Sequence, residues 1–185
     1  MEDVERLAED LLNAVPAYIW DGDTLPIPIE EIADSHVGLL VRDVDDLEQA
    51  PGAPTLGKGQ SLSGLLLPAL GEIWVNAIEA REWPPRRRFT IAHELGHWSL
   101  HRHANCPVFC RSGSIESEAP ERRPPLPAHE EQANAFAAAM MMPARLVQEQ
   151  YARCERDFFL LCEAFGASGA AMGRRLRAVI KPGTA

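Results

Sequence analysis

The sequence predicts an α+β domain in which a small, mostly antiparallel sheet packs on one long helix and the C-terminal half is helical. Two short apolar runs joined by turn residues indicate a hairpin, and two long runs with helical spacing follow it. From residue 143 the helical spacing continues almost to the end of the chain. The length of 185 residues suits a single domain, which we divide into 1–60, 61–142 and 143–185.

The first 60 residues are expected to form two helices and a first strand. Residues 3–14 carry apolar side chains at helical spacing until Pro16 ends the pattern. The stretch 25–33 opens with two prolines and continues as a short helical pattern, and the apolar run 36–42 predicts a buried strand. Residues 43–60 are acidic and then rich in glycine and proline, which predicts a loop.

The middle of the chain is expected to hold the hairpin and the two strong helices. The two arms of the hairpin are 63–67 and 72–76, because the residues between them favour a turn. Pro84 and Pro85 mark the start of a helix at 86–101, since proline suits a first helical turn. The segment after it, rich in proline and serine, predicts a long irregular loop. This loop is expected to span 104–127. Four helices are expected after it, at 128–142, 143–153, 155–165 and 169–180.

Charge and composition narrow the classes of partner and compartment. The formal net charge of −9 disfavours direct binding to nucleic acid, because phosphate backbones repel an acidic chain. The acidic N-terminus lacks the basic start and apolar stretch of a signal peptide, and no apolar run is long enough to span a bilayer. We therefore expect a cytoplasmic protein with reduced cysteines and no membrane partner.

The helix at 86–101 contains the pattern His-Glu-x-x-His. His93 and His97 are one helical turn apart on one face, so both imidazoles can reach a single zinc ion. Glu94 lies about 100° around the helix from His93 and can act as a general base and acid without binding the metal. The flanking residues are apolar, so the helix belongs in the core, where such polar groups are costly without a metal or partners.

A third metal ligand has two candidates from spacing. His103 lies ten residues after His93, but Leu100 stands where that longer histidine pattern requires a turn-forming glycine. Glu130 lies on the next strong helix, with Asn134 one turn later on the same face, where its amide can hold a ligand histidine. Glu131 competes with Glu130, and spacing alone leaves open whether both are ordinary helix N-terminal acids.

Two blocks of the sequence resemble the ImmA/IrrE family of metallopeptidases. Residues 88–101 read Arg-Phe-Thr-Ile-Ala-His-Glu-Leu-Gly-His-Trp-Ser-Leu-His, and residues 130–143 read Glu-Glu-Gln-Ala-Asn-Ala-Phe-Ala-Ala-Ala-Met-Met-Met-Pro. The family shows Arg-Phe-Thr-x-Ala-His-Glu-Leu-Gly-His, then Glu-x-x-Ala-Asn-x-Phe-Ala-Ala and Met-Pro. The resemblance extends over about residues 60–178, and Ala167 departs from the family's usual valine.

The resemblance implies a gluzincin-like zinc metalloendopeptidase. Aligned on Ala133 and Asn134, it implies one zinc ion per chain held by His93, His97 and Glu130. Family members often cleave a helix-turn-helix repressor and thereby release phage, mobile-element or stress genes, so the resemblance implies such a protein partner. The alternative is a non-proteolytic regulator that sequesters a repressor or toxin through the same fold.

Three further expectations concern the surroundings of the metal. An extended substrate would pair with a sheet edge above the zinc, for which strand 72–76 is one candidate. Tyr151 is a candidate donor to a developing oxyanion. His101, His103, Cys106 and Cys110 are candidate ligands of a second, structural zinc, but Cys-x-x-x-Cys is looser than the usual spacing, which favours reduced thiols in a loop.

Overall fold

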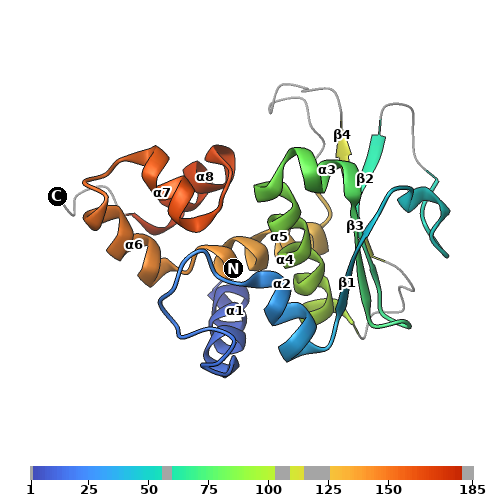
Figure 1. Ribbon diagram of the computed structural model, residues 1–185, viewed down its shortest axis with the longest axis horizontal. Helices are drawn as coiled ribbons and strands as arrows, with labels where there is room; N and C mark the ends of the chain where they lie inside the picture. Colours follow the sequence, from blue (N-terminus) through green and yellow to red (C-terminus); the bar gives the residue numbers. More distant parts are fainter. Residues whose placement is uncertain (1, 56–59, 103–108, 115–125, 181–185) are drawn as a thin grey trace.

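The sheet of the computed structural model has four strands, and its order is β1-β3-β2-β4 (Figure 1). The structure describes residues 2–55, 60–102, 109–114 and 126–180. β2 pairs antiparallel with both β3 and β4, whereas β1 runs parallel to β3. The predicted α+β class is confirmed, with the correction that the sheet is mixed. The strands are β1 (Leu40–Val44), β2 (Gln60–Leu67), β3 (Glu72–Asn76) and β4 (Phe109–Ser114).

Helices cover one face of this sheet and make up the C-terminal half (Figure 1). α4 lies between the sheet and α5, with contacts to β2 and β3 on one side and to α5 on the other. None of the described helices is long and apolar enough to cross a membrane. The helices are α1 (Glu2–Ala14), α2 (Ile29–Glu31), α3 (Ala77–Glu82), α4 (Pro84–His101), α5 (Ala128–Met141), α6 (Ala144–Arg153), α7 (Phe158–Phe165) and α8 (Gly169–Val179), with a π-helix η1 (Ile32–Val37) and a 3₁₀ helix η2 (Leu47–Gln49).

The N-terminal strand differs from the expected buried strand at 36–42. The first two residues of the expected strand, 36 and 37, belong instead to η1. This helix is capped by Gly38, which has the left-handed conformation with φ of 81°. β1 begins at Leu40, and its side chains are exposed or half-buried because it is an edge of the sheet. The apolar run therefore indicated a strand correctly, but the strand begins later than predicted and is not buried.

Part of the expected loop at 104–127 is a strand. β4 pairs with β2 over Phe109–Ser114, a segment that has a polar, glycine-containing sequence without clear alternation. Its strand state depends on pairing with a distant part of the chain, which local sequence does not report. β4 forms the sheet edge beside β2, and β3 is internal because it pairs with β1 and β2. The expected substrate-pairing edge at 72–76 is therefore wrong.

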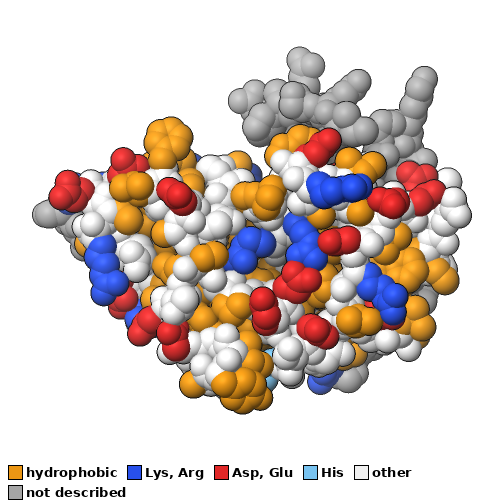
Figure 2. All heavy atoms as spheres, viewed as in Figure 1, with side chains coloured by type: hydrophobic (Ala, Val, Ile, Leu, Met, Phe, Trp, Pro, Cys, Tyr) orange, Lys and Arg blue, Asp and Glu red, His pale blue; other side chains and the backbone are white. Residues whose placement is uncertain are grey.

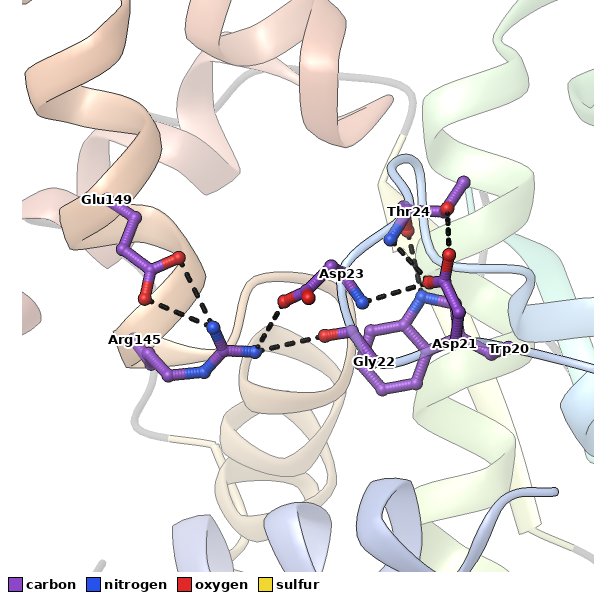
Figure 3. A network of polar contacts seen from close by, with 7 residues as sticks. All are labelled: Trp20, Asp21, Gly22, Asp23, Thr24, Arg145 and Glu149. Atoms are coloured by element: carbon purple, nitrogen blue, oxygen red, sulfur yellow. Dashed lines mark hydrogen bonds and ion pairs between the residues drawn. The ribbon is translucent and has the colours of Figure 1, made fainter. Parts of the chain in front are cut away.

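The C-terminal helices are tied to the N-terminal segment by two arginines. Arg175 of α8 is buried, donates to the Met142 carbonyl at 2.7 Å and pairs with Glu5 of α1. Arg145 of α6 donates at 3.0 Å to the Gly22 carbonyl and also contacts Asp23 and Glu149 (Figure 3). The expected helix at 155–165 starts later, at Phe158, because Asp157 caps its first turn by accepting from two backbone amides.

The loop that Arg145 contacts is held by its own hydrogen bonds (Figure 3). Asp21 accepts from the Thr24 hydroxyl and from the Thr24 and Asp23 amides, which lowers the pKa of its carboxyl to about 2. Trp20 donates from Nε1 to the Thr24 carbonyl at 2.8 Å. These contacts give the segment before α2 a defined shape against α6.

Arg87 of α4 fixes the N-terminal segment to the central helix. Its guanidinium donates to Glu30 of α2 at 2.9 Å and to Asp43 of β1 at 2.9 Å. The hydrogen bond from Arg87 lowers the pKa of Glu30 below its ordinary value of 4.5, against the opposing effect of burial. One side chain thus joins α2, β1 and α4.

We predict that Glu30→Gln destabilises the protein at neutral pH and that this loss disappears in acid. Because the folded-state pKa of Glu30 lies below 4.5, its ionised form contributes stability above about pH 4.5, and this is lost as pH falls. Because the side chain is 44% exposed, we expect at most about 1 kcal/mol. Urea unfolding of wild type and variant from pH 7 to pH 3 measures the difference, with Glu9→Gln as an exposed control. A pH-independent difference would contradict the prediction.

Candidate metal centre

Helix α4 brings two imidazoles together in the core. His93 and His97 are one turn apart, with side chains 1% and 0% exposed, and their Nε2 atoms lie 3.1 Å apart. Apolar neighbours on the same helix, including Ile91 and Leu95, are fully buried and pack the helix between the sheet and α5. The predicted orientation of both imidazoles toward one point is therefore present.

Helix α5 supplies the third donor. Glu130 lies in its first turn, and its two carboxylate oxygens are each 3.2 Å from an imidazole, Oε2 from His93 Nε2 and Oε1 from His97 Nε2. A tetrahedral ion with bonds of 2.0–2.1 Å separates its ligands by about 3.3–3.4 Å. One carboxylate oxygen thus faces each imidazole, one ligand atom from each of the three side chains lies within 4.8 Å of the others, and the group could hold a metal ion.

Close packing of the two helices makes this spacing attainable. A Cβ placed on Gly96 would lie only 3.2 Å from the Ala133 Cα and 3.2 Å from its carbonyl oxygen. A glycine facing an alanine thus lets α4 and α5 approach almost backbone to backbone. Ala133 is three residues after Glu130, so this contact brings the start of α5 close to the two imidazoles.

The structure brings Glu130, and not Glu131, to the imidazoles. Glu131 is exposed and lines a groove of about 540 Å³ between α5 and α8. Burial raises the pKa of Glu130, but hydrogen bonding to His93 and His97 outweighs this and holds the pKa well below its ordinary range. A carboxylate that stays ionised among imidazoles is suited to a cation.

Asn134 orients one of the imidazoles. Its side-chain Oδ1 lies 3.2 Å from His93 Nδ1, one turn of α5 after Glu130. Because an amide oxygen can only accept, a hydrogen belongs on Nδ1, so Nε2 is the ring nitrogen that faces Glu130 and that a metal would bind in place of a proton. The ring is therefore held in the tautomer that binds a metal through Nε2.

Strand β2 forms the wall beside Glu94. The Glu94 side chain is fully buried, and a Cβ on Gly64 would lie 3.3 Å from its Oε1 and only 2.4 Å from Thr90 Cγ2. The pairing of β2 with β4 shifts register between Leu62 and Gly64, so Ser63 is the extra residue of a β-bulge. The backbone of β2 therefore passes directly over the carboxylate.

Two residues of α4 and α3 hold this bulge in place. Arg86 donates to the Ser63 hydroxyl at 2.9 Å and pairs with Glu79 at 2.8 Å. Sequence reasoning did not single out Gly64, although a glycine within an apolar strand pattern is the available signal for a bulge or a close approach.

The other predicted site residues lie elsewhere or outside the described residues. Tyr151 lies on α6, partly buried against the core, and its oxyanion role stays a prediction. His101 ends α4 with its ring centroid 5.6 Å from that of His97, and burial lowers its pKa. Of the proposed second cluster, His103 and Cys106 are outside the described residues, and Cys110 lies on β4.

His129 is a neighbour of the centre that sequence reasoning missed. Its ring centroid lies 5.9 Å from that of His97, and its Nε2 lies 3.6 Å from Glu130 Oε1. Its side chain is 51% exposed, in contrast to the two buried imidazoles. The available signal was its position directly before Glu130 in the sequence.

Comparisons with known proteins agree with this fold and show the family of the chain. A peptidase family model described as "IrrE N-terminal-like domain" matches residues 67–177, more than half of the chain. A solved structure described as "Mycobacterium tuberculosis transcriptional regulator" is similar with a TM-score of 0.57 and 19% identity. The match covers 99% of this chain but only 49% of that one, so this chain spans about half its length. The search of curated proteins finds no match.

We predict that Asn134→Ala weakens zinc binding by about 10–100-fold, because His93 loses the partner that fixes its tautomer and ring orientation. Competition with a chromophoric chelator measures the affinity. Glu131→Gln, three residues earlier on α5 and exposed, is the matched control and should bind zinc like wild type. Equal affinities of Asn134→Ala and wild type would show that the amide does not support the site.

We also predict that Gly64→Ala lowers the free energy of unfolding by about 1–3 kcal/mol, because the new methyl group overlaps Thr90. Zinc affinity should change little, since the three donors lie on α4 and α5. The same substitution at Gly173, where a Cβ would meet only Arg177 at 3.8 Å, should leave stability unchanged or raise it by up to about 1 kcal/mol. Urea unfolding tests both, and unaltered stability of Gly64→Ala would contradict the close approach.

Proposed function

Because the chain belongs to the family of IrrE N-terminal-like peptidases, we propose that it is a zinc-dependent metalloendopeptidase that cleaves a helix-turn-helix transcriptional repressor. The observation that carries the proposal is the convergence of His93, His97 and Glu130 at 3.1–3.2 Å, with Glu94 on the same turn of α4 as the first imidazole. In the proposal these three residues bind one zinc ion, and Glu94 is the general base and acid.

The donor set suits zinc. Two imidazole nitrogens and one carboxylate are a recurrent ligand set of catalytic zinc, and three protein ligands leave one coordination position open. A zinc ion bound there would act as a Lewis acid that polarises a peptide carbonyl and makes water more acidic. The amide of Asn134 supports this assignment, because it holds the His93 ring with Nε2 facing the other two donors.

Glu94 moves the protons of the proposed reaction. Its carboxylate takes one proton from the attacking water while the water oxygen bonds to the carbonyl carbon of the scissile peptide. As the carbon–nitrogen bond breaks, the same carboxyl group gives that proton to the leaving amine. Burial of Glu94 beneath β2 keeps this side chain away from bulk solvent, so it is positioned by the protein and not by water.

An extended substrate would pair with β4. This strand is the sheet edge beside β2, and β2 carries Gly64 over Glu94. The other edge, β1, is separated from β2 by β3 and lies farther from the carboxylate within the sheet. Strand addition at β4 would hold a peptide by main-chain hydrogen bonds, which is the usual way an exposed edge binds an extended segment.

The repressor substrate is supported by the family resemblance and by the charge of the chain. On the face in Figure 2, acidic and basic side chains are interspersed over the described residues. Together with a net charge of −9, this favours a protein partner over direct contact with a nucleic acid. The similar solved structure is described as a transcriptional regulator, which is why a binding role without cleavage remains the alternative.

We predict that Glu94→Gln abolishes cleavage of a helix-turn-helix regulator that the wild-type protein cleaves. Removing the general base should slow peptide hydrolysis by about 10²–10⁴-fold. Zinc binding should be retained, because Glu94 is not among the three converging donors. Co-expression with a tagged regulator, followed by immunoblotting and a reporter for its target promoter, measures both cleavage and derepression.

Two outcomes decide between the enzyme and the alternative. Glu131→Gln, which changes a nearby exposed acid, is the matched control and should cleave like wild type. If Glu94→Gln still releases the promoter and no cleavage product forms with either protein, the peptidase proposal fails and the sequestering regulator replaces it.

A further inference from the structure

We propose that His129 is a further catalytic residue, which donates a hydrogen bond to the carbonyl oxygen of the scissile peptide as that oxygen gains negative charge. The inference rests on the proposed peptidase function and adds a residue that no motif assigns. It starts from the position of the imidazole, on the solvent side of the three converging donors.

The exposure of the surrounding side chains defines the side from which a substrate can arrive. His93, His97 and Glu94 are essentially inaccessible, and Glu130 is 19% exposed. His129, at 51%, is far more accessible than the other four. Of the side chains at the centre, His129 is therefore the one that a molecule arriving from solvent can contact most readily.

The distances place one nitrogen of His129 beside the centre. Its Nε2 lies 3.6 Å from Glu130 Oε1, the same oxygen that lies 3.2 Å from His97 Nε2. That separation exceeds an ordinary hydrogen bond, and the His129 side chain makes no shorter polar contact among the described residues. Its ring nitrogen can therefore reach a molecule that binds beside Glu130.

His129 is poorly placed to be a fourth ligand of the same ion. The ligand atoms of His93, His97 and Glu130 all lie within 4.8 Å of one another, and in the described part of the chain His129 does not join that group. The ring thus lies beside the three donors, in contact with Glu130, without being one of their group.

The chemistry of peptide hydrolysis calls for a donor at this place. The carbonyl oxygen becomes an oxyanion when water adds to the carbon, and a neutral imidazole N–H can stabilise it. A role in helix stability does not explain the residue, because a histidine in the first turn of α5 gains nothing from the helix dipole.

The backbone carbonyl of the same residue has a separate structural role. It hydrogen-bonds to His101 at the end of α4, and the two rings lie 6.2 Å apart in an edge arrangement. This contact fixes the first turn of α5 against α4, while the His129 side chain is half exposed beside Glu130. The backbone is therefore anchored while the side chain stays free to meet a substrate.

Binding of inorganic phosphate to the cobalt-loaded full chain tests the inference without a known substrate. Phosphate is a tetrahedral oxyanion, and its binding is followed by the visible absorption of cobalt(II). We expect His129→Ala to raise the phosphate Kd by about tenfold, the effect of losing one hydrogen bond to a charged group. His129→Gln, which keeps a neutral donor, should remain within about threefold of wild type by the same reasoning. Zinc affinity, measured by chelator competition, should stay within about threefold in both variants.

The control and the contradicting results are distinct. His36→Ala removes a histidine in η1 and should leave phosphate and zinc binding unchanged. An unchanged phosphate Kd in His129→Ala, or a wild-type protein that takes up metal but no phosphate, overturns the inference alone. A loss of zinc affinity of about 100-fold also overturns it, because His129 would then be a ligand. A wild-type chain that binds no zinc overturns the proposed function as well.

Discussion

The contact between Gly96 of α4 and Ala133 of α5 is the constraint on which the centre depends. The two histidines lie on α4 and the glutamate lies on α5, which begins 27 residues after α4 ends. Local sequence therefore does not bring the three side chains together. A side chain at position 96 would already touch the backbone of Ala133 at 3.2 Å. Because the donors must lie about 3.3–3.4 Å apart to share one tetrahedral ion, a helix separation larger by one methyl group would disperse them.

A second close approach, on the opposite side of α4, determines the surroundings of Glu94. Gly64 lets β2 pass over the carboxylate, and the adjacent bulge at Ser63 is held by Arg86. Arg87, the next residue, joins α2 and β1 to the same helix. α4 is therefore fixed by ion pairs at its first turns and by close packing in its middle, which is where the functional side chains lie. The functional side chains of α4 are therefore positioned by contacts of residues that are not themselves metal ligands or catalytic groups.

The sequence predicted the parts of this arrangement that have a local signal. Helical spacing placed His93 and His97 on one face, and turn residues placed the β2–β3 hairpin. Glu130 could not be separated from Glu131 by spacing, because both lie in the first turn of α5, and only the family resemblance favoured it. The structure brings Glu130 to the imidazoles since that face of α5 packs on α4.

The parts that sequence reasoning missed depend on contacts between distant segments. β4 is a strand because it pairs with β2, and its own residues carry no clear strand pattern. The same pairing makes β4 an edge, and the pairing of β3 with both β1 and β2 makes β3 internal, so the expected substrate edge was wrong. His129 becomes notable only when α5 lies beside His97. In each case the deciding interaction joins residues that the sequence separates.

Anomalous diffraction at the zinc absorption edge, from crystals of the zinc-loaded protein, tests the central claim most directly. We expect one strong peak per chain, within about 2.0–2.2 Å of His93 Nε2, His97 Nε2 and a carboxylate oxygen of Glu130. The fourth position should face the side on which His129 lies. A peak bound elsewhere, for example by cysteines, or full zinc loading without a peak between these three residues, would contradict the account.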